Sequence, residues 1–161
     1  MMGVSITRPS RAEFSAFVRT VEPKLLDALV ATYGPVDGRE ATVDALSWAW
    51  ENWDRLIDVS NKVGYLYRVG QSATRRFVVR DLRLTGSHAA DLHVPDVEPG
   101  LVPALGALSD QQRTAVLLVH AFDWSQTEVA ALLEVTPSTV REHLRRALER
   151  LRGNLEVHDA H

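Results

Sequence analysis

The stretch from Ser125 to Leu151 constrains the fold of this chain most, because it encodes two short helices separated by a tight turn. Ser125 and Glu128 have the spacing of a capping box, the reciprocal pair that starts a helix. Thr136 and Pro137 mark a second helix start, since proline at the first helical position loses no hydrogen bond. The second helix combines an apolar face with polar and charged residues on its other sides: Ser138, Thr139, Arg141, Glu142, Arg145 and Arg146. This pattern predicts a helix-turn-helix, whose second helix enters the major groove of DNA.

An ordinary αα-hairpin with a solvated polar face is the alternative interpretation of this stretch. Helices this short need a third partner, and Ser109 is placed to cap a further amphipathic helix over residues 110–120. The three arginines also lie within about a turn and a half of one another, which favours a nucleic-acid surface. One residue argues against the helix-turn-helix interpretation. Glu134 occupies the turn position that requires a left-handed backbone, where any residue other than glycine costs roughly 1 kcal/mol.

The composition limits the class of protein. A chain of 161 residues with 45% hydrophobic content can form one compact domain or two small ones. The absence of cysteine excludes disulfides, thiolate zinc sites and cysteine nucleophiles. No apolar run approaches the ~18 residues that would span a membrane, and the first residues lack the apolar core of a signal peptide. We therefore expect a soluble, cytoplasmic protein.

The N-terminal segment predicts two helices. Ser10 and Glu13 form another capping box, and apolar residues follow at helical spacing up to Gly34, with Pro23 predicting a kink or two abutting helices. A second helix is expected to start at Asp37 and continue to residue 53. Its sequence contains three tryptophans, Trp48, Trp50 and Trp53. They cannot all share one face, because helix positions two apart diverge by about 200°.

A third helix is expected to begin near Asn61, after a loop over residues 56–60. It interleaves Tyr65 and Tyr67 with arginines at 68, 75, 76 and 80. Aromatic rings stack on unpaired bases while guanidinium groups hold phosphates, so this inventory suits single-stranded nucleic acid. A solvated arginine face with half-buried tyrosines is the alternative, and spacing alone favours it.

Residues 82–105 break the helical pattern with glycine and proline and carry an acidic excess. They predict a flexible acidic linker, and the residues after Gly153 are expected to fray. The net charge of −3 is therefore unevenly distributed, with two arginine-bearing surfaces separated by an acidic segment. We expect an all-α fold with two small helical domains, at residues 10–82 and 106–153, joined by a linker at residues 83–105.

These residues resemble a known family. Residues 12–152 are similar to the small, extracytoplasmic-function (ECF) sigma factors of the sigma-70 type, which consist of regions two and four joined by a linker. The resemblance to region four follows residues 108–152 nearly position for position, including the Trp124-Ser125 entry turn and the Thr139-Val140 and Arg146-Ala147 pairs. In region two it is carried by Glu40, Asp44, Leu46, Ala49 and Trp50, and by Asn61 with the run from Tyr65 to Val69.

The resemblance implies partners and sites. Core RNA polymerase and promoter DNA are the expected partners, with an anti-sigma factor as a further candidate; no cofactor and no metal are expected. The second helix would bind polymerase through Glu40, Asp44, Trp48 and Trp50. The third helix would hold the melted promoter strand through Asn61, Tyr65, Arg68, Arg75, Arg76 and Arg80. The recognition helix would read the upstream element through Ser138, Thr139, Arg141, Glu142, Arg145 and Arg146.

The chain departs from the family pattern in four places. Val43 stands where the family often has glutamine, Ser72 and Arg76 stand where it often has asparagine and aspartate, and Glu134 replaces the turn glycine. The changes at residues 72 and 76 motivate an alternative: a sigma-like helix-turn-helix regulator that binds polymerase or DNA without initiating transcription.

An enzyme is the alternative from another class. The six histidines are scattered without HExxH spacing, and no P-loop, GxSxG or GxGxxG motif occurs. We therefore expect a protein that is not an enzyme.

Overall fold

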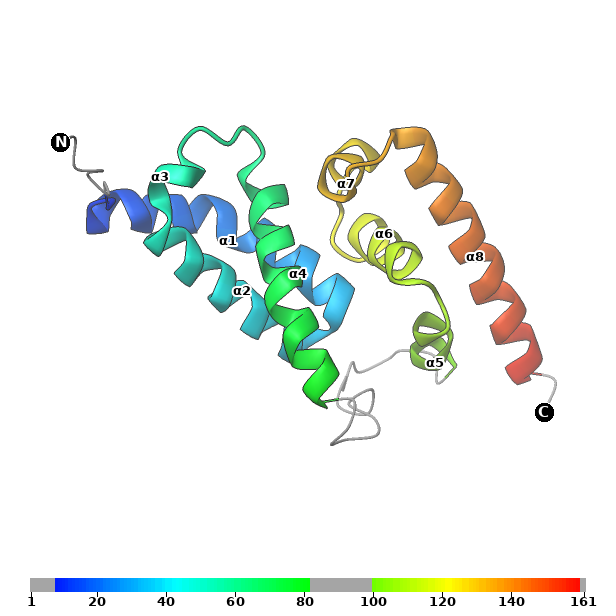
Figure 1. Cartoon of the computed structure of the whole chain (residues 1–161). Coiled ribbons are helices and arrows are strands. Elements are labelled where there is room, and N and C mark those ends of the chain that lie inside the picture. Colours follow the sequence, from blue (N-terminus) through cyan, green and yellow to red (C-terminus); the bar gives the residue numbers. More distant parts are fainter. Residues whose placement is uncertain (1–7, 82–99, 160–161) are drawn as a thin grey trace. The chain divides into compact units, whose positions relative to one another are not determined.

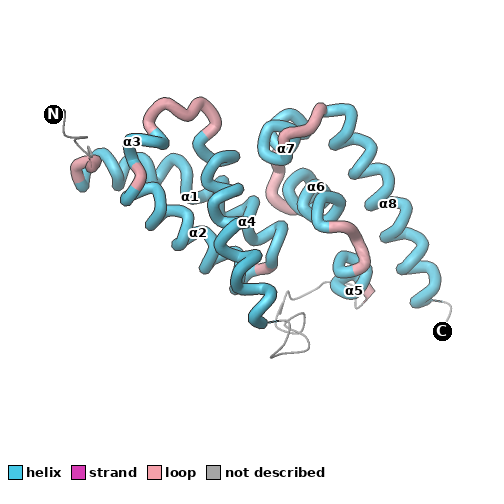
Figure 2. Tube along the Cα trace, in the orientation of Figure 1, coloured by secondary structure: helices cyan, strands magenta, loops and turns pink. Residues whose placement is uncertain are grey.

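The computed structural model describes residues 8–81 and 100–159, with the side chains of residues 74–81, 102 and 157–159 outside the description. Every regular element within these ranges is a helix, which agrees with the expected all-α fold (Figures 1 and 2). The chain divides into two compact units, unit 1 over Met1–Val78 and unit 2 over Val79–His161.

In unit 1, two antiparallel helices begin the fold: α1 (Arg11–Tyr33) and α2 (Pro35–Glu51) (Figure 1). Ser10 caps α1 through the predicted capping box, with Glu13 N donating to Ser10 Oγ at 3.1 Å. Gly34 connects the helices at φ 90°, a left-handed conformation that favours glycine. The helix expected from Asp37 starts two residues earlier, because Pro35 fits the first helical position.

Of the two alternatives expected at Pro23, a kink or two abutting helices, the second is wrong, since α1 continues through Pro23 as one helix. Proline removes one hydrogen bond to the preceding turn, but Pro23 is exposed, so water can replace that bond. Val21, Leu25 and Leu29 are 5% exposed or less and bury one face of α1 on both sides of the proline. Their burial holds the helix together across Pro23.

The contact between α1 and α2 is close enough to require a glycine. A Cβ atom at Gly38 would lie 2.6 Å from Val30 Cα and 2.6 Å from Val30 N. Helix α4 (Lys62–Asp81) completes the unit, because Gly70 lies against Leu29 and the Ala41 carbonyl. A buried 2.7 Å hydrogen bond between the Thr32 and Tyr67 hydroxyls also joins α4 to α1.

A single turn of helix, α3 (Trp53–Leu56), and a loop connect α2 to α4. The predicted start of α4 near Asn61 is confirmed. Asn61 Oδ1 accepts a hydrogen bond from Gly64 N at 3.0 Å and so caps the first turn.

Unit 2 consists of α5 (Leu101–Gly106), α6 (Asp110–His120), α7 (Gln126–Leu133) and α8 (Pro137–Asp159). The capping box at Ser125 starts α7 as predicted, and Ser109 caps α6 as predicted, in a capping box with Gln112. Two boundaries were predicted wrongly.

The first wrong boundary is the end of the linker, because residues 101–106 are helical. Ala104 is 3% exposed and Leu108 is 5% exposed, and α5 contacts α8. Pro103 is tolerated in the first turn, where backbone N–H groups have no partner within the helix. The rest of the predicted linker, residues 82–99, lies outside the described residues.

The second wrong boundary is the predicted fraying after Gly153, since α8 continues to Asp159. Leu151 and Leu155 are four residues apart, so the apolar stripe of α8 passes the glycine without a break. One glycine costs a helix only about 1 kcal/mol, which this packing offsets.

We expect Gly38→Ala to lower the free energy of unfolding by about 1–3 kcal/mol, because the added methyl group meets the backbone of α1 rather than a movable side chain. Urea denaturation followed by tryptophan fluorescence measures this change, since three of the four tryptophans lie in unit 1.

Gly153→Ala is the matched control, because nothing lies within 4 Å of its added Cβ. It should raise the stability by about 0.5–1 kcal/mol. Equal stability of Gly38→Ala and wild type would contradict the close contact of α1 and α2.

Candidate nucleic-acid interface

The α7–α8 segment has the geometry of a helix-turn-helix. Glu134 ends α7 in the left-handed conformation, at φ 56° and ψ 43°, as its turn position predicted. Val135 N then donates to Ala130 O at 3.0 Å, which tightens the turn. Thr136 accepts a hydrogen bond from Thr139 N at 3.2 Å and caps α8 as expected.

One face of α8 is buried in unit 2. Val140, Leu144, Ala147 and Leu151 are at most 8% exposed, and α8 contacts α5, α6 and α7. Leu118 of α6 and Val129 of α7 are fully buried in the same unit. The packing fixes the rotation of α8 about its own axis, so it also fixes which residues face outward.

The six residues predicted to bind DNA all lie off this buried face. Ser138, Arg141, Arg145 and Arg146 are exposed, and Thr139 and Glu142 are partly exposed. Arg141 Nη2 donates to Ser138 Oγ at 3.0 Å. The structure therefore brings these six residues together on the exposed sides of one helix.

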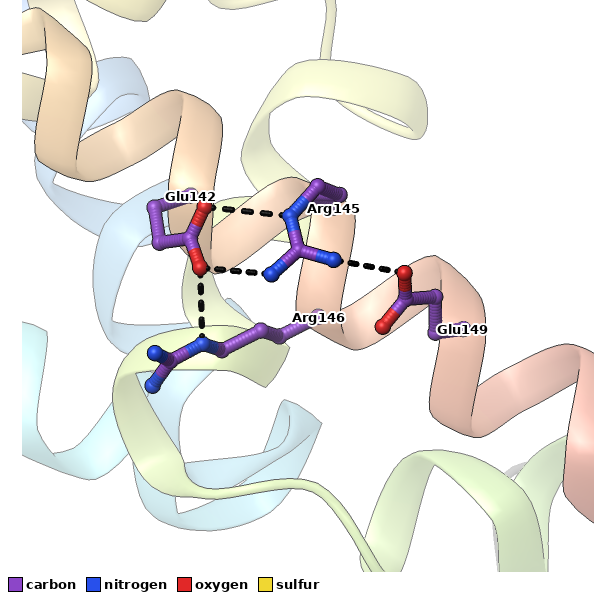
Figure 3. Close-up of polar contacts among 4 residues, drawn as sticks. All are labelled: Glu142, Arg145, Arg146 and Glu149. Carbon is purple, nitrogen blue, oxygen red and sulfur yellow. Dashed lines mark hydrogen bonds and ion pairs between the residues drawn. The ribbon is translucent and has the colours of Figure 1, made fainter.

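Four charged residues of this surface form a connected cluster, Glu142, Arg145, Arg146 and Glu149 (Figure 3). Arg145 donates to both oxygens of Glu142, from Nε to Oε2 at 3.1 Å and from Nη2 to Oε1 at 2.7 Å. Arg146 Nε donates to Glu142 Oε1 at 2.9 Å, and Arg145 Nη1 donates to Glu149 Oε1 at 2.6 Å. The sequence indicated three arginines on one helix but not that Glu142 and Glu149 would bind two of them.

The cluster changes the acidity of its central carboxylate. Hydrogen bonds from Arg145 lower the pKa of Glu142 from 4.5 to about 2, and Arg146 adds to the effect. The paired carboxylates in turn raise the pKa of Arg145. Because the pKa of Glu142 is lowered, its ion pairs persist as the pH falls, until the pH approaches 2.

In unit 1 the residues predicted to bind polymerase divide into two groups. Glu40 and Asp44 are exposed on α2, beside the exposed apolar side chains of Val36 and Val43, which are 66% and 63% exposed. Val43 was singled out from the sequence only as a departure from the family pattern, and Val36 was not singled out. A valine at a polar position of an amphipathic helix is the signal that could have found it.

The two tryptophans of that set make ring contacts inside unit 1. The centroid of Trp50 is 5.0 Å from that of Phe14, in an edge-on arrangement. Trp48 lies 5.5 Å from Tyr65 of α4. Both tryptophans are partly buried, so each presents only part of its ring to a partner.

The residues predicted to hold the melted strand lie on α4 and at its start. Asn61 is exposed and caps the helix, whereas Tyr65 and Arg68 are partly buried. Tyr67 is 3% exposed and bonded to Thr32, so its ring cannot stack on a base. Arg75, Arg76 and Arg80 belong to α4, and their side chains lie outside the described residues.

The described residues contain no group of three or more histidine or acidic side chains placed to hold a metal ion. Among the helices in the same ranges, none is both long enough and apolar enough to cross a membrane.

Comparison with known proteins decides the family. The family model for sigma-70, region 4 matches residues 101–151. The RNA polymerase sigma-E factor of Streptomyces avermitilis is 33% identical over 156 residues, which covers 91% of this chain and 87% of the relative. The chain belongs to the sigma-70 family of RNA polymerase sigma factors. The sigma-E factor of Streptomyces antibioticus is also similar, at 32% identity over 158 residues.

Solved structures agree with the fold of this sigma factor. The sigma factor RpoE of Bartonella quintana, in complex with the anti-sigma factor NepR, is similar at a TM-score of 0.61 and 23% identity, covering 89% of this chain and 97% of that one. CnrH, in complex with the cytosolic domain of CnrY, is similar at a TM-score of 0.57 and 19% identity. These similarities show the fold, and the predicted all-α fold class is confirmed.

We expect Arg145→Ala to raise the pKa of Glu142 from about 2 toward its ordinary value of 4.5, because it removes the largest cause of the lowering. A pH titration of the Glu142 carboxyl carbon by NMR measures the pKa directly.

Arg152→Ala is the matched control, since it removes the same charge from an exposed position of α8 about ten residues away. It should leave the pKa of Glu142 nearly unchanged. An unchanged pKa in Arg145→Ala would show that the arginine does not hold the carboxylate in solution.

Proposed function

We propose that this sigma factor binds core RNA polymerase through α2, holds the melted promoter strand with α4 and reads the upstream promoter element with α8. Its curated relatives are named RNA polymerase sigma factors, which favours transcription initiation over a regulator that does not initiate. We assign residues 10–82 to the polymerase-binding and strand-binding domain. The DNA-reading domain, first expected at residues 106–153, is extended to begin at Leu101 because α5 packs on α8.

The observation that carries the proposal is the orientation of α8. The buried stripe from Val140 to Leu151 turns a polar, arginine-bearing surface outward at the start of a 23-residue helix. Recognition helices contact base edges with residues near their N-terminus. Ser138 and Thr139 lie in the first turn, where backbone N–H groups favour phosphate.

Arg141 is the leading candidate for a contact to guanine or phosphate. It is exposed in the second turn, and it donates from Nη2 to Ser138 Oγ. Since guanidinium has five N–H donors, Arg141 keeps donors for DNA. A bidentate contact from arginine to guanine is the commonest specific contact in the major groove.

The outward surface of α2 combines charge with exposed apolar groups. Glu40 and Asp44 supply acidic side chains beside Val36 and Val43, which suits a basic partner surface with apolar contacts of its own. We propose this surface as the polymerase-binding site. The ring contacts of Trp48 and Trp50 favour a supporting role for both, because part of each ring is already covered.

For α4 we propose capture of the melted strand. Tyr65 remains partly exposed and offers a ring for base stacking, which contributes about 1–3 kcal/mol per base. Asn61 and Arg68, together with Arg75, Arg76 and Arg80, would contact the strand or its phosphates. Tyr67 is excluded from this role by its burial.

The site of action and further partners follow from this function. We propose that the protein acts in the cytoplasm, where core polymerase and the chromosome are found, and that it has no enzymatic activity of its own. We also propose an anti-sigma factor as a regulatory partner, since RpoE and CnrH are both similar in fold and both were solved with a bound partner.

Transcription from pooled genomic fragments tests the function. Core polymerase with this protein should produce discrete starts that share two short upstream elements. In that assay Arg141→Ala should weaken use of the upstream element by about 1–3 kcal/mol without changing polymerase binding. Polymerase binding without any transcript start would instead support the regulator that does not initiate.

Reversing the charge of Asp44 tests the polymerase-binding site. We expect Asp44→Lys to weaken binding to core polymerase at least about tenfold, because it places like charges together. Fluorescence anisotropy of labelled protein titrated with core polymerase, without DNA, measures the affinity. Asp54→Lys is the control on α3, exposed like Asp44 but outside α2; equal losses in both variants would argue against a site on α2.

A further inference from the structure

Glu142 lies at the centre of the outward surface of α8. At ~100° per residue, it stands roughly opposite the middle of the stripe formed by Val140, Leu144, Ala147 and Leu151. Arg145 lies about 60° to one side of it and Arg146 about 40° to the other. A helix that enters a groove with its apolar side turned away therefore presents Glu142 toward the groove floor.

The arginines fill most of the acceptor sites of this carboxylate. Oε1 accepts from Arg145 Nη2 and from Arg146 Nε, which uses both of its lone-pair positions. Oε2 accepts only from Arg145 Nε. One acceptor position on Oε2 remains, and the Glu142 side chain is 44% exposed.

The same bonds restrict Arg145. Its Nε and Nη2 face Glu142, and its Nη1 donates to Glu149. The edge of the guanidinium formed by Nε and Nη2 is therefore occupied and cannot grip a guanine in the bidentate manner. Arg145 holds a carboxylate in place, whereas Arg141 keeps donors for DNA.

The chemistry of the groove selects the partner of a carboxylate. Phosphates repel it, and a carboxylate cannot donate a hydrogen bond when ionised. Among the groups on base edges in the major groove, the N4 amino group of cytosine and the N6 amino group of adenine are donors. Adenine also presents its N7 acceptor beside the amino group, which would face the second carboxylate oxygen, so cytosine is the better match.

We propose that Glu142 determines specificity by accepting a hydrogen bond from a cytosine N4 amino group in the upstream promoter element, and that Arg145 and Arg146 are its positioning residues. This inference rests on the proposed role of α8 in reading DNA. The two arginines also offset the negative charge of Glu142 near the phosphates. An isolated carboxylate on this surface would have no such compensation.

A promoter library with every upstream-element position randomised tests the inference. Holoenzyme assembled from core polymerase and the full chain selects from the library, and bound DNA is sequenced. Wild type should prefer cytosine at one position, and Glu142→Gln should reduce that preference about 5- to 150-fold, the range of one good base contact. Because glutamine pairs with adenine in a bidentate manner, adenine should gain at the same position.

Two variants separate positioning from general effects. Arg145→Ala should weaken the cytosine preference at that one position and leave the others as in wild type. Glu149→Gln is the matched control, since Glu149 is bonded to Arg145 but lies about two turns beyond Glu142 on α8. Its base preferences should equal those of wild type.

The outcomes distinguish the inference from the proposed function. If Arg141→Ala weakens binding while Glu142→Gln keeps every base preference, α8 reads DNA but Glu142 does not, and the inference is overturned. If neither variant changes selection at any position, α8 does not read the element, and both proposals fail together. Melting curves that match wild type confirm that each variant is folded.

Discussion

Burial of the apolar stripe of α8 is the interaction on which unit 2, the proposed DNA-reading unit, depends. Val140 and Ala147 are fully buried, and Leu144 and Leu151 nearly so. Fully burying a valine or leucine contributes about 1.5–3 kcal/mol, whereas the helices α6 and α7 are too short to be stable alone. The same contacts fix the rotation of α8, so the polar surface that faces outward is a consequence of the core.

The polar side of α8 is ordered by charge rather than by packing. Four charged residues at helical spacings of three and four form one cluster around Glu142 and Arg145, and both residues have shifted pKa values. Exposed ion pairs contribute little to stability, so the cluster is better explained by orientation than by stability. It holds these side chains in place without DNA, which would lower the entropy lost in the proposed binding of α8 to DNA.

The sequence predicted the helices and their caps because those signals are local. Ser10, Ser109 and Ser125 each begin a helix through a capping box, and Glu134 takes the left-handed conformation that its position requires. The errors at Pro23, Pro103 and Gly153 involve tertiary contacts that override a local breaker, whereas the misplaced start of α2 overlooked the local preference of Pro35 for the first helical position. The candidate sites were harder. The burial of Tyr67 depends on its tertiary contact with Thr32, whereas the bonds of Glu142 follow the three- and four-residue spacings at which opposite charges pair on a helix, a signal that the interpretation of the sequence did not use.

In unit 1 the two helices with proposed functions, α2 and α4, pack against each other. Trp48 of α2 lies against Tyr65 of α4, so the helix that would bind polymerase supports the helix that would hold the strand. Gly70 lets α4 approach Leu29 and Ala41 closely, and the Thr32–Tyr67 hydrogen bond holds the helices together. A buried interior of this kind deforms little, so α2 and α4 keep fixed positions within unit 1. The proposed polymerase-binding and strand-binding surfaces are therefore two sides of one small packed core.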